Sequence, residues 1–189
     1  MILLIVILIG GVLLDQGSKW LATSFLAGKE TITLIPPRIL ELTYLTNEGV
    51  AGGAFAGNRL ATLIFPILGI VALTVYLFRF CSKEKRYRIP IALILTGGAG
   101  NLIDRIFRGE VVDFISMPWL PWVQFHPFRF VDFPIFNVAD TCITLGALAI
   151  VIVLVVDLIK EGKTARQKRA EAGKEATSEQ EQNHDETDG

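Results

Sequence analysis

Two aspartates in apolar sequence contexts could carry out hydrolytic chemistry in this chain. Asp113 lies between Val112 and Phe114 in VVDFI, and Asp140 ends the sequence FNVAD. Desolvation disfavours the charged form of a carboxyl group and so raises its pKa. When two carboxyl groups share a small dry site, one keeps a proton while the other is charged, and such a pair can activate water against a carbonyl group. Asp113 and Asp140 are therefore our candidate catalytic dyad.

Other hydrolytic mechanisms fit the sequence less well. A serine or cysteine triad needs a base beside the nucleophile, but the two histidines are His126, in an aromatic segment, and His184, near the C-terminus. The sequence has no HExxH pattern or comparable set of zinc ligands. Asp132, in FVDFP, is a further carboxylate, which we place on the surface of a loop because Pro134 and aromatic residues surround it. We expect an aspartic mechanism with no metal and no cofactor.

Long apolar segments must position these side chains. Hydrophobic residues make up 51% of the 189 residues, charged residues make up 20%, and the mean hydropathy is +0.49. A helix needs about 20 apolar residues to cross a bilayer. We therefore predict an all-α membrane protein, a bundle of four transmembrane helices with a small extracytoplasmic β-containing segment. The predicted spans are about 1–26, 60–80, 89–107 and 138–156, and the outer segments are 27–59 and 108–136.

Basic residues near the span ends predict the orientation, because cytoplasmic loops retain Lys and Arg. They crowd the link between the second and third spans and the segment after the fourth span, so both termini are expected in the cytoplasm. Residues 1–159 form the predicted membrane domain. Residues 160–189 are rich in Glu, Lys, Gln and Ala, and we predict a disordered cytoplasmic tail there. The first segment lacks a basic n-region and a small-residue cleavage site, so we interpret it as a span and not as a cleaved signal.

The two outer segments differ in character. The alternating patterns TITLIPP and ILELTYLTN, within 27–59, predict short strands interrupted by Pro36 and Pro37. The segment 108–136 is rich in Trp and Phe and contains four prolines, so it is too broken for a helix. Aromatic rings of this kind favour the level of the lipid headgroups. We interpret this segment as an interfacial anchor, as a lipid-facing wall of a binding site, or as both.

Polar residues of several predicted elements fall in one layer near the outer membrane surface. A rise of 1.5 Å per residue puts Asn101 about 18 Å, and Asp104 and Arg105 about 23 Å, from the inner end of their span. Ionisable groups near the centre of a span cost roughly 2.5 to 3.5 kcal/mol each, so they are usually paired or functional. The residues predicted in this layer are Asp15, Lys19, Asn101, Asp104, Arg105, Asp113, Asn137 and Asp140.

A structural explanation competes for three pairs in this layer. Asn137 and Asp140 could be a helix N-cap and the third residue of that helix. Asp15 and Lys19 could form an ion pair within one helix. Asp104 and Arg105 could lock helices together. Asp113 has no basic neighbour in the sequence and no comparable structural explanation.

In combination, the motifs resemble the lipoprotein signal peptidase family, the type II signal peptidases of bacteria. The resemblance covers residues 15–146, and the motifs occur in the order and spacing of that family. They are DQGSK from Asp15, NEG from Asn47, GNLIDR followed by GEVVDF, and FNVAD followed by TCITLG. The segment NEGVAGGAF departs from the family by delaying its aromatic residue, Phe55.

The resemblance implies an aspartic endopeptidase that removes the signal peptide from diacylglyceryl-modified prolipoproteins, on the N-terminal side of the lipid-modified cysteine. It implies the bacterial cytoplasmic membrane, with the site near the outer leaflet, contact with membrane lipids, a monomer, and neither nucleic acid nor metal as a partner. It again selects Asp113 and Asp140 as the dyad. Asn47, Asn101, Arg105 and Asn137 would position the peptide or orient the dyad, supported by Asp15, Lys19 and Asp104.

Two other functions remain open from the residues alone. Intramembrane Asp, Arg and Lys also build ion paths, so a small ion-coupled transporter is possible. Transporter sites favour the bilayer midplane and repeated halves, whereas the polar layer here lies in the outer third and no repeat is found in the sequence. The second alternative is a noncatalytic membrane scaffold whose polar cluster fixes helix packing.

Overall fold

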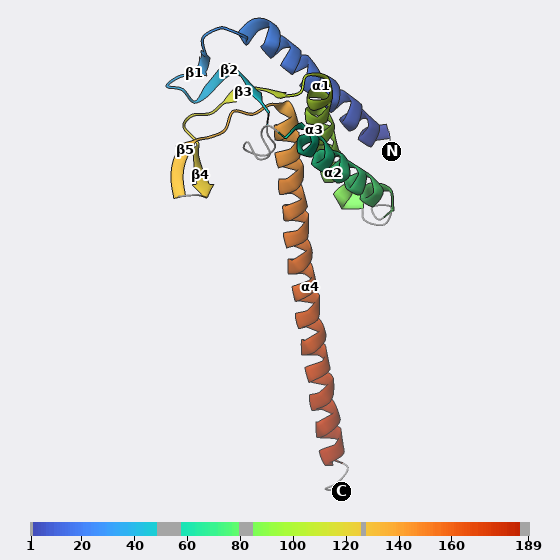
Figure 1. Ribbon diagram of the computed structural model, residues 1–189. Coiled ribbons are helices and arrows are strands. Elements are labelled where there is room, and N and C mark those ends of the chain that lie inside the picture. Colours follow the sequence, from blue (N-terminus) through green and yellow to red (C-terminus); the bar gives the residue numbers. More distant parts are fainter. Residues whose placement is uncertain (1, 49–57, 80–84, 126–127, 186–189) are drawn as a thin grey trace. The chain divides into compact units, whose positions relative to one another are not determined.

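The computed structural model describes residues 2–48, 58–79, 85–125 and 128–185 (Figure 1). The chain divides into two compact units, Met1–Ala149 and Ile150–Gly189. Among the described residues, the first unit contains three α-helices, the strands and the beginning of the last helix, α4. The second unit consists of the rest of α4 and the C-terminus.

The helices are α1 (Ile2–Leu26), α2 (Arg59–Arg79), α3 (Arg88–Phe107) and α4 (Val138–Asp185), with a 3₁₀ turn, η1 (Lys85–Tyr87), before α3. Stretches that are long and apolar enough to cross a membrane occur four times among the described residues. They are Ile2–Leu26, Arg59–Arg79, Lys85–Phe107 and Val138–Thr164. The prediction of four membrane-spanning helices is thus confirmed. The outward faces of α1, α2 and α4 expose large Leu, Ile, Val and Phe side chains, as expected where lipid is the solvent.

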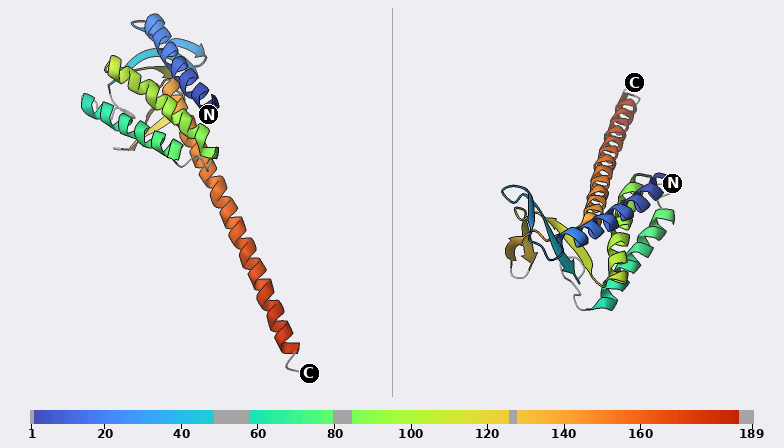
Figure 2. Two further views of the ribbon diagram at one scale, coloured as in Figure 1. Left: turned by 90° about the vertical axis from the view of Figure 1, so that its right-hand side faces the viewer. Right: turned by 90° about the horizontal axis from the view of Figure 1, so that it is seen from above.

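Helix α3 is the most buried of the spans and contacts both α1 and α2. Both views of Figure 2 place it between them. Glycines allow the close approach of the neighbouring elements. A Cβ atom on Gly97 would collide with the carbonyl oxygen of Ala139, and one on Gly100 would lie 2.5 Å from Asp15 Oδ2. Larger residues at these two positions would push α1 and the start of α4 away from α3.

An antiparallel sheet lies against the C-terminal end of α1 (Figure 1). Its strands are β1 (Ile32–Ile35), β2 (Leu40–Asn47) and β3 (Val111–Ser116), in the order β1-β2-β3. Strands β4 (Pro121–Phe125) and β5 (Phe128–Asp132) form a separate antiparallel hairpin. The predicted β-containing segment is therefore confirmed, and it draws strands from both outer segments.

Strand alternation positions Asp113. Val112 and Phe114 are buried in an apolar cluster with Ala22 and Leu26 of α1. Successive side chains of a strand point to opposite faces, so Asp113 points away from this cluster. It is paired in register with Leu45 of β2. The apolar packing of its two neighbours fixes the direction of the carboxyl group.

The structure differs from the sequence-based expectations in two places. Asp132, which we expected in a loop, is the last residue of β5 and pairs with Pro121. Residues 160–185, which we expected to be disordered, continue α4 as helix. Glu, Lys, Gln and Ala are polar or small, but they are also strong helix formers, and a preceding span provides the nucleus for such a helix.

Candidate active site

The site begins at the N-terminus of α4, where Asn137 and Asp140 cap each other. Asn137 Oδ1 accepts from the backbone N–H of Asp140 at 2.9 Å, and Asp140 Oδ2 accepts from the backbone N–H of Asn137 at 3.2 Å. This reciprocal pair satisfies two amides that a helix start leaves free. The capping explanation is therefore correct for these residues. It leaves Asp140 Oδ1 and Asn137 Nδ2 available for other contacts.

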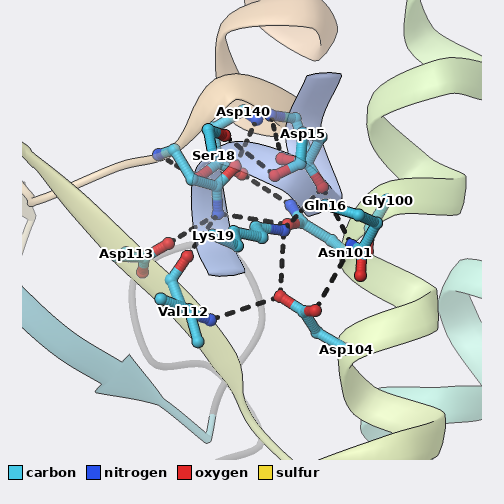
Figure 3. A network of polar contacts seen from close by, with 12 residues as sticks. Asp15, Gln16, Ser18, Lys19, Gly100, Asn101, Asp104, Val112, Asp113 and Asp140 are labelled. Atoms are coloured by element: carbon cyan, nitrogen blue, oxygen red, sulfur yellow. Dashed lines mark hydrogen bonds and ion pairs between the residues drawn. The ribbon is translucent and has the colours of Figure 1, made fainter. Parts of the chain in front are cut away.

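Those remaining atoms connect α4 to α3 and β3 (Figure 3). Asn101 Nδ2 donates to Asp140 Oδ1 at 2.7 Å. Asn137 Nδ2 donates to Asp113 Oδ1 at 2.6 Å and to Asn101 Oδ1 at 3.1 Å. Both carboxyl groups of the candidate dyad therefore accept hydrogen bonds from Asn137, one through its side chain and one through its backbone.

Asp113 is 2% exposed and its carboxyl group is held at both oxygens. Asn47 Nδ2 donates to Oδ2 at 3.3 Å, opposite the contact with Asn137. Burial raises the pKa of Asp113 from 3.8 to about 6, and the negative charge of Asp140 adds to the rise. The hydrogen bonds from Asn137 and Asn47 and the positive charge of Lys19 act in the opposite direction. Asp113 can therefore gain or lose a proton close to neutral pH.

A second set of charged side chains, from Lys19, Asp15 and Asp104, lies next to the dyad. Lys19 is fully buried, and its Nζ atom lies 2.9 Å from Asp15 Oδ2, 3.0 Å from Asp104 Oδ2 and 2.8 Å from Asn101 Oδ1. The ion pair predicted between Asp15 and Lys19 is present. Asp104 also links α3 to α1, through the ion pair between its carboxylate and Lys19.

Asp15 connects α1 directly to the start of α4. Its Oδ1 atom accepts from the backbone N–H of Ala139 at 2.8 Å. A carboxylate at a helix N-terminus stabilises the exposed amides and the positive end of the helix dipole. The approach depends on Gly100, because no side chain separates α3 from the Asp15 carboxylate there.

Gln16 also belongs to this network, although the sequence pattern did not single it out. Its Nε2 atom donates to Asp15 Oδ2 at 3.1 Å, to the carbonyl oxygen of Gly100 at 3.0 Å and to Asp104 Oδ1 at 3.3 Å. Its place in the motif DQGSK was the available signal. An amide is a common residue on a helix surface, so residue type alone did not indicate a site.

Arg105 lies on α3 beside the dyad and is 7% exposed. Its Nη1 atom donates to the carbonyl oxygen of Asn101 at 3.3 Å, and its charge interacts with Asp140 and Asp113. A guanidinium group in this position can bind a peptide carbonyl or a developing negative charge. All nine candidate residues from the sequence therefore belong to one local region.

Other candidate chemistry lies elsewhere. His126 lies outside the described residues, and Asp132 belongs to the β4–β5 hairpin. In the part of the chain that the structure describes, no three His, Cys, Asp or Glu side chains are grouped as metal ligands.

A cavity of about 280 Å³ is open near the end of α3, where Arg108 Nη1 lies 3.6 Å from Asp104 Oδ1. It is lined by Glu48, Arg59, Thr62, Arg108, Gly109 and Glu110.

The chain is similar to known proteins over the region that contains this site. The family model of signal peptidase (SPase) II matches residues 6–156, which include every candidate residue. A lipoprotein signal peptidase of Chlorobium phaeobacteroides is 37% identical over 75% of this chain and 83% of its own length. One of Clostridium acetobutylicum is 35% identical over 81% and 94%. The solved structure of a bacterial membrane enzyme aligns with a TM-score of 0.71 at 30% identity, over 84% of this chain and 90% of that chain.

Proposed function

Because the chain belongs to the signal peptidase II family, whose members remove signal peptides from prolipoproteins, we propose that Asp113 and Asp140 are the catalytic dyad of this peptidase. One observation carries the proposal. Two carboxyl groups from separate elements, β3 and α4, accept hydrogen bonds from Asn137, and the charge of one raises the pKa of the other. Membership of a peptidase family also decides against the transporter and the scaffold.

In the proposed reaction one carboxyl group of the dyad is charged and the other is protonated. The charged group takes a proton from water, and the water oxygen attacks the carbonyl carbon of the scissile peptide bond. The protonated group gives its proton to the carbonyl oxygen, which forms a gem-diol. The carbon–nitrogen bond then breaks as the nitrogen takes the proton that came from water. The gem-diol returns a proton to the second carboxyl group, so the dyad ends in its starting state.

The neighbouring polar side chains orient this chemistry. Asn101 donates a hydrogen bond to one carboxyl oxygen of Asp140. Asn137 and Asn47 donate to the two carboxyl oxygens of Asp113. Arg105 is the group that we assign to the substrate carbonyl, because its charge lies close to both members of the dyad. The supporting network of Asp15, Lys19 and Asp104 keeps α1, α3 and α4 in register.

We further propose that the substrate is a diacylglyceryl-modified prolipoprotein, cut on the N-terminal side of its lipid-modified cysteine. The apolar outward faces of the spans suit a substrate whose lipid chains remain in the bilayer. All proposed catalytic groups come from one chain, so we assign the monomer as the active unit. Residues 1–159 then form the peptidase domain and the remainder a cytoplasmic tail.

The chain is a multi-pass bacterial membrane protein. We propose that both termini lie in the cytoplasm, since basic residues crowd the link between α2 and α3 and the segment after the span of α4. The N-terminus of α4 and the C-terminal end of α3, which contribute to the candidate site, then lie near the outer leaflet. Labelling of single cysteines introduced after Thr164 tests this orientation, and reaction with a membrane-impermeant reagent in intact cells would contradict it.

The test is cleavage of a purified precursor that carries the diacylglyceryl group, compared with the same precursor without it. We expect cleavage of the modified precursor only, and we expect Asp113→Asn and Asp140→Asn each to abolish it. Asp132→Asn is the matched control, since this carboxylate lies on the β4–β5 hairpin, and it should keep most activity. Turnover by either dyad variant would refute the assignment. Equal processing of both precursors would refute the lipid requirement.

A further inference from the structure

The ammonium group of Lys19 is fully buried, and its contacts are made with residues that surround the dyad. An ammonium group has three N–H donors. The three atoms within reach of Lys19 Nζ belong to Asn101, Asp15 and Asp104. Fully buried ion pairs contribute little net stability, because the loss of hydration offsets their attraction. A role beyond holding two helices together is therefore worth seeking.

The contact with Asn101 determines how that side-chain amide is oriented. Asn101 Oδ1 accepts from Lys19 Nζ at 2.8 Å and from Asn137 Nδ2 at 3.1 Å. With the oxygen held on this side, Asn101 Nδ2 must point to Asp140 Oδ1, which lies 2.7 Å away. The reversed amide would place an NH₂ group against two donors and an oxygen against a carboxylate. Of the two donors to Oδ1, the charged Lys19 forms the stronger hydrogen bond.

Building on the proposed dyad, we propose that Lys19 is a positioning residue of the reaction. It holds the Asn101 amide in the orientation that donates to Asp140, and thereby fixes the direction of one carboxyl group of the dyad. Lys19 does not touch the substrate in this role, and its effect passes through Asn101.

The charge of Lys19 gives this role a signature in the pH dependence. Lys19 favours the charged form of Asp113 and so lowers its pKa. Loss of Lys19 should raise the pKa of Asp113 further, and the corresponding limb of the activity profile should move to higher pH. The charged and titratable groups that surround Lys19 are Asp15 on α1, Asp104 and Arg105 on α3, Arg108 directly after α3, Asp113 on β3 and Asp140 on α4.

The experiment must separate positioning from simple charge balance. Lys19→Met alone leaves Asp15 and Asp104 without their shared cation, and this variant can fail to fold. The double variant Lys19→Met with Asp104→Asn removes one positive and one negative charge, so the net charge of the buried cluster is that of the native protein. Lys29→Met is the matched control, because Lys29 lies exposed in the turn that follows α1, outside the site.

We measure kcat, KM and the pH profile of each purified variant on the diacylglyceryl-modified precursor, per amount of folded protein. For the double variant we expect native folding, a fall in kcat of about 10- to 100-fold with little change in KM, and a profile moved to higher pH. Lys29→Met should match the native protein. If the double variant regains native kcat with an unmoved profile, Lys19 serves charge balance only and the inference is overturned.

The same assay tests the proposed dyad separately from the positioning role of Lys19. Asp113→Asn and Asp140→Asn are measured in the same assay. Turnover by either of them refutes the proposed function whatever Lys19 does. Two inactive dyad variants beside a fully active double variant refute only the positioning role of Lys19.

Discussion

Replacement of Asp113 by Asn should change how the stability of the protein depends on pH. The pKa of Asp113 rises from 3.8 to about 6 on folding, chiefly because the carboxyl group is buried. Between these two values the folded protein binds more protons than the unfolded chain does, so its stability falls as the pH rises. A shift of about two pKa units corresponds to about 3 kcal/mol. This stabilisation is complete below about pH 4 and is lost once the pH has risen past 6.

The assay is thermal or denaturant unfolding in one detergent or lipid from pH 4 to pH 7.5, for the native protein and for Asp113→Asn. Asn has no titrating proton, so the difference between the two proteins reports the titration of Asp113 together with its coupling to Asp140, while the titration of distant groups cancels. Relative to the variant, the native protein should lose about 3 kcal/mol between pH 4 and pH 7.5. The amide also changes the contacts with Asn137 and Asn47, but this offset is the same at each pH. A difference that is flat over this range would refute the burial of a titrating carboxyl group at this position.

Three further outcomes are expected. Gly100→Ala should destabilise the protein by roughly 2 kcal/mol and reduce activity, because the added Cβ would lie 2.5 Å from Asp15 Oδ2. The control is Gly10→Ala, which has open space for the added Cβ and should be neutral or slightly stabilising. Equal melting temperatures for the two variants would contradict this expectation. Asn137→Ala should cost about 1 kcal/mol as a lost N-cap and should raise the pKa of Asp113, which a pH profile identical to that of the native enzyme would disprove. Metal chelators should leave the cleavage rate unchanged, and inhibition that added zinc reverses would contradict a dyad made of carboxylates alone.

The sequence predicts the spans and the dyad because both depend on local patterns. Apolar length alone indicates four helices. The bounds of the first three spans agree with the prediction to within a few residues, whereas the fourth continues past 156 to Thr164. Asp113 is conspicuous because Val112 and Phe114 flank it, and this alternation is the one that places it on β3. The spacing of Asn137 and Asp140 predicts a reciprocal cap, which is present.

The contacts between distant segments could not be predicted in the same way. Lys19 is separated from Asn101 by 82 positions, and no local pattern predicts that the Lys19 ammonium group donates to the Asn101 side chain. The sequence indicated that Asp104 and Arg105 lock helices together, but not which residues they reach; the structure pairs Asp104 with Lys19 of α1. Gln16 was missed because two of its three acceptors, Gly100 and Asp104, lie on α3. The helical continuation of α4 beyond residue 160 reflects the helix propensity of Glu, Lys, Gln and Ala, whereas the prediction of disorder relied on the polar composition of the same residues.

The most direct test of the central claim is a double-mutant cycle on the dyad. Cleavage of the diacylglyceryl-modified precursor is measured for Asp113→Asn, for Asp140→Asn and for the double variant, each corrected for the amount of folded protein. Residues that act as one unit show strongly non-additive losses. We predict that the double variant is no slower than either single variant. Measurable cleavage by the single variants, with losses that multiply in the double variant, would show that the two carboxyl groups act independently, and would contradict a dyad that shares one proton and one water.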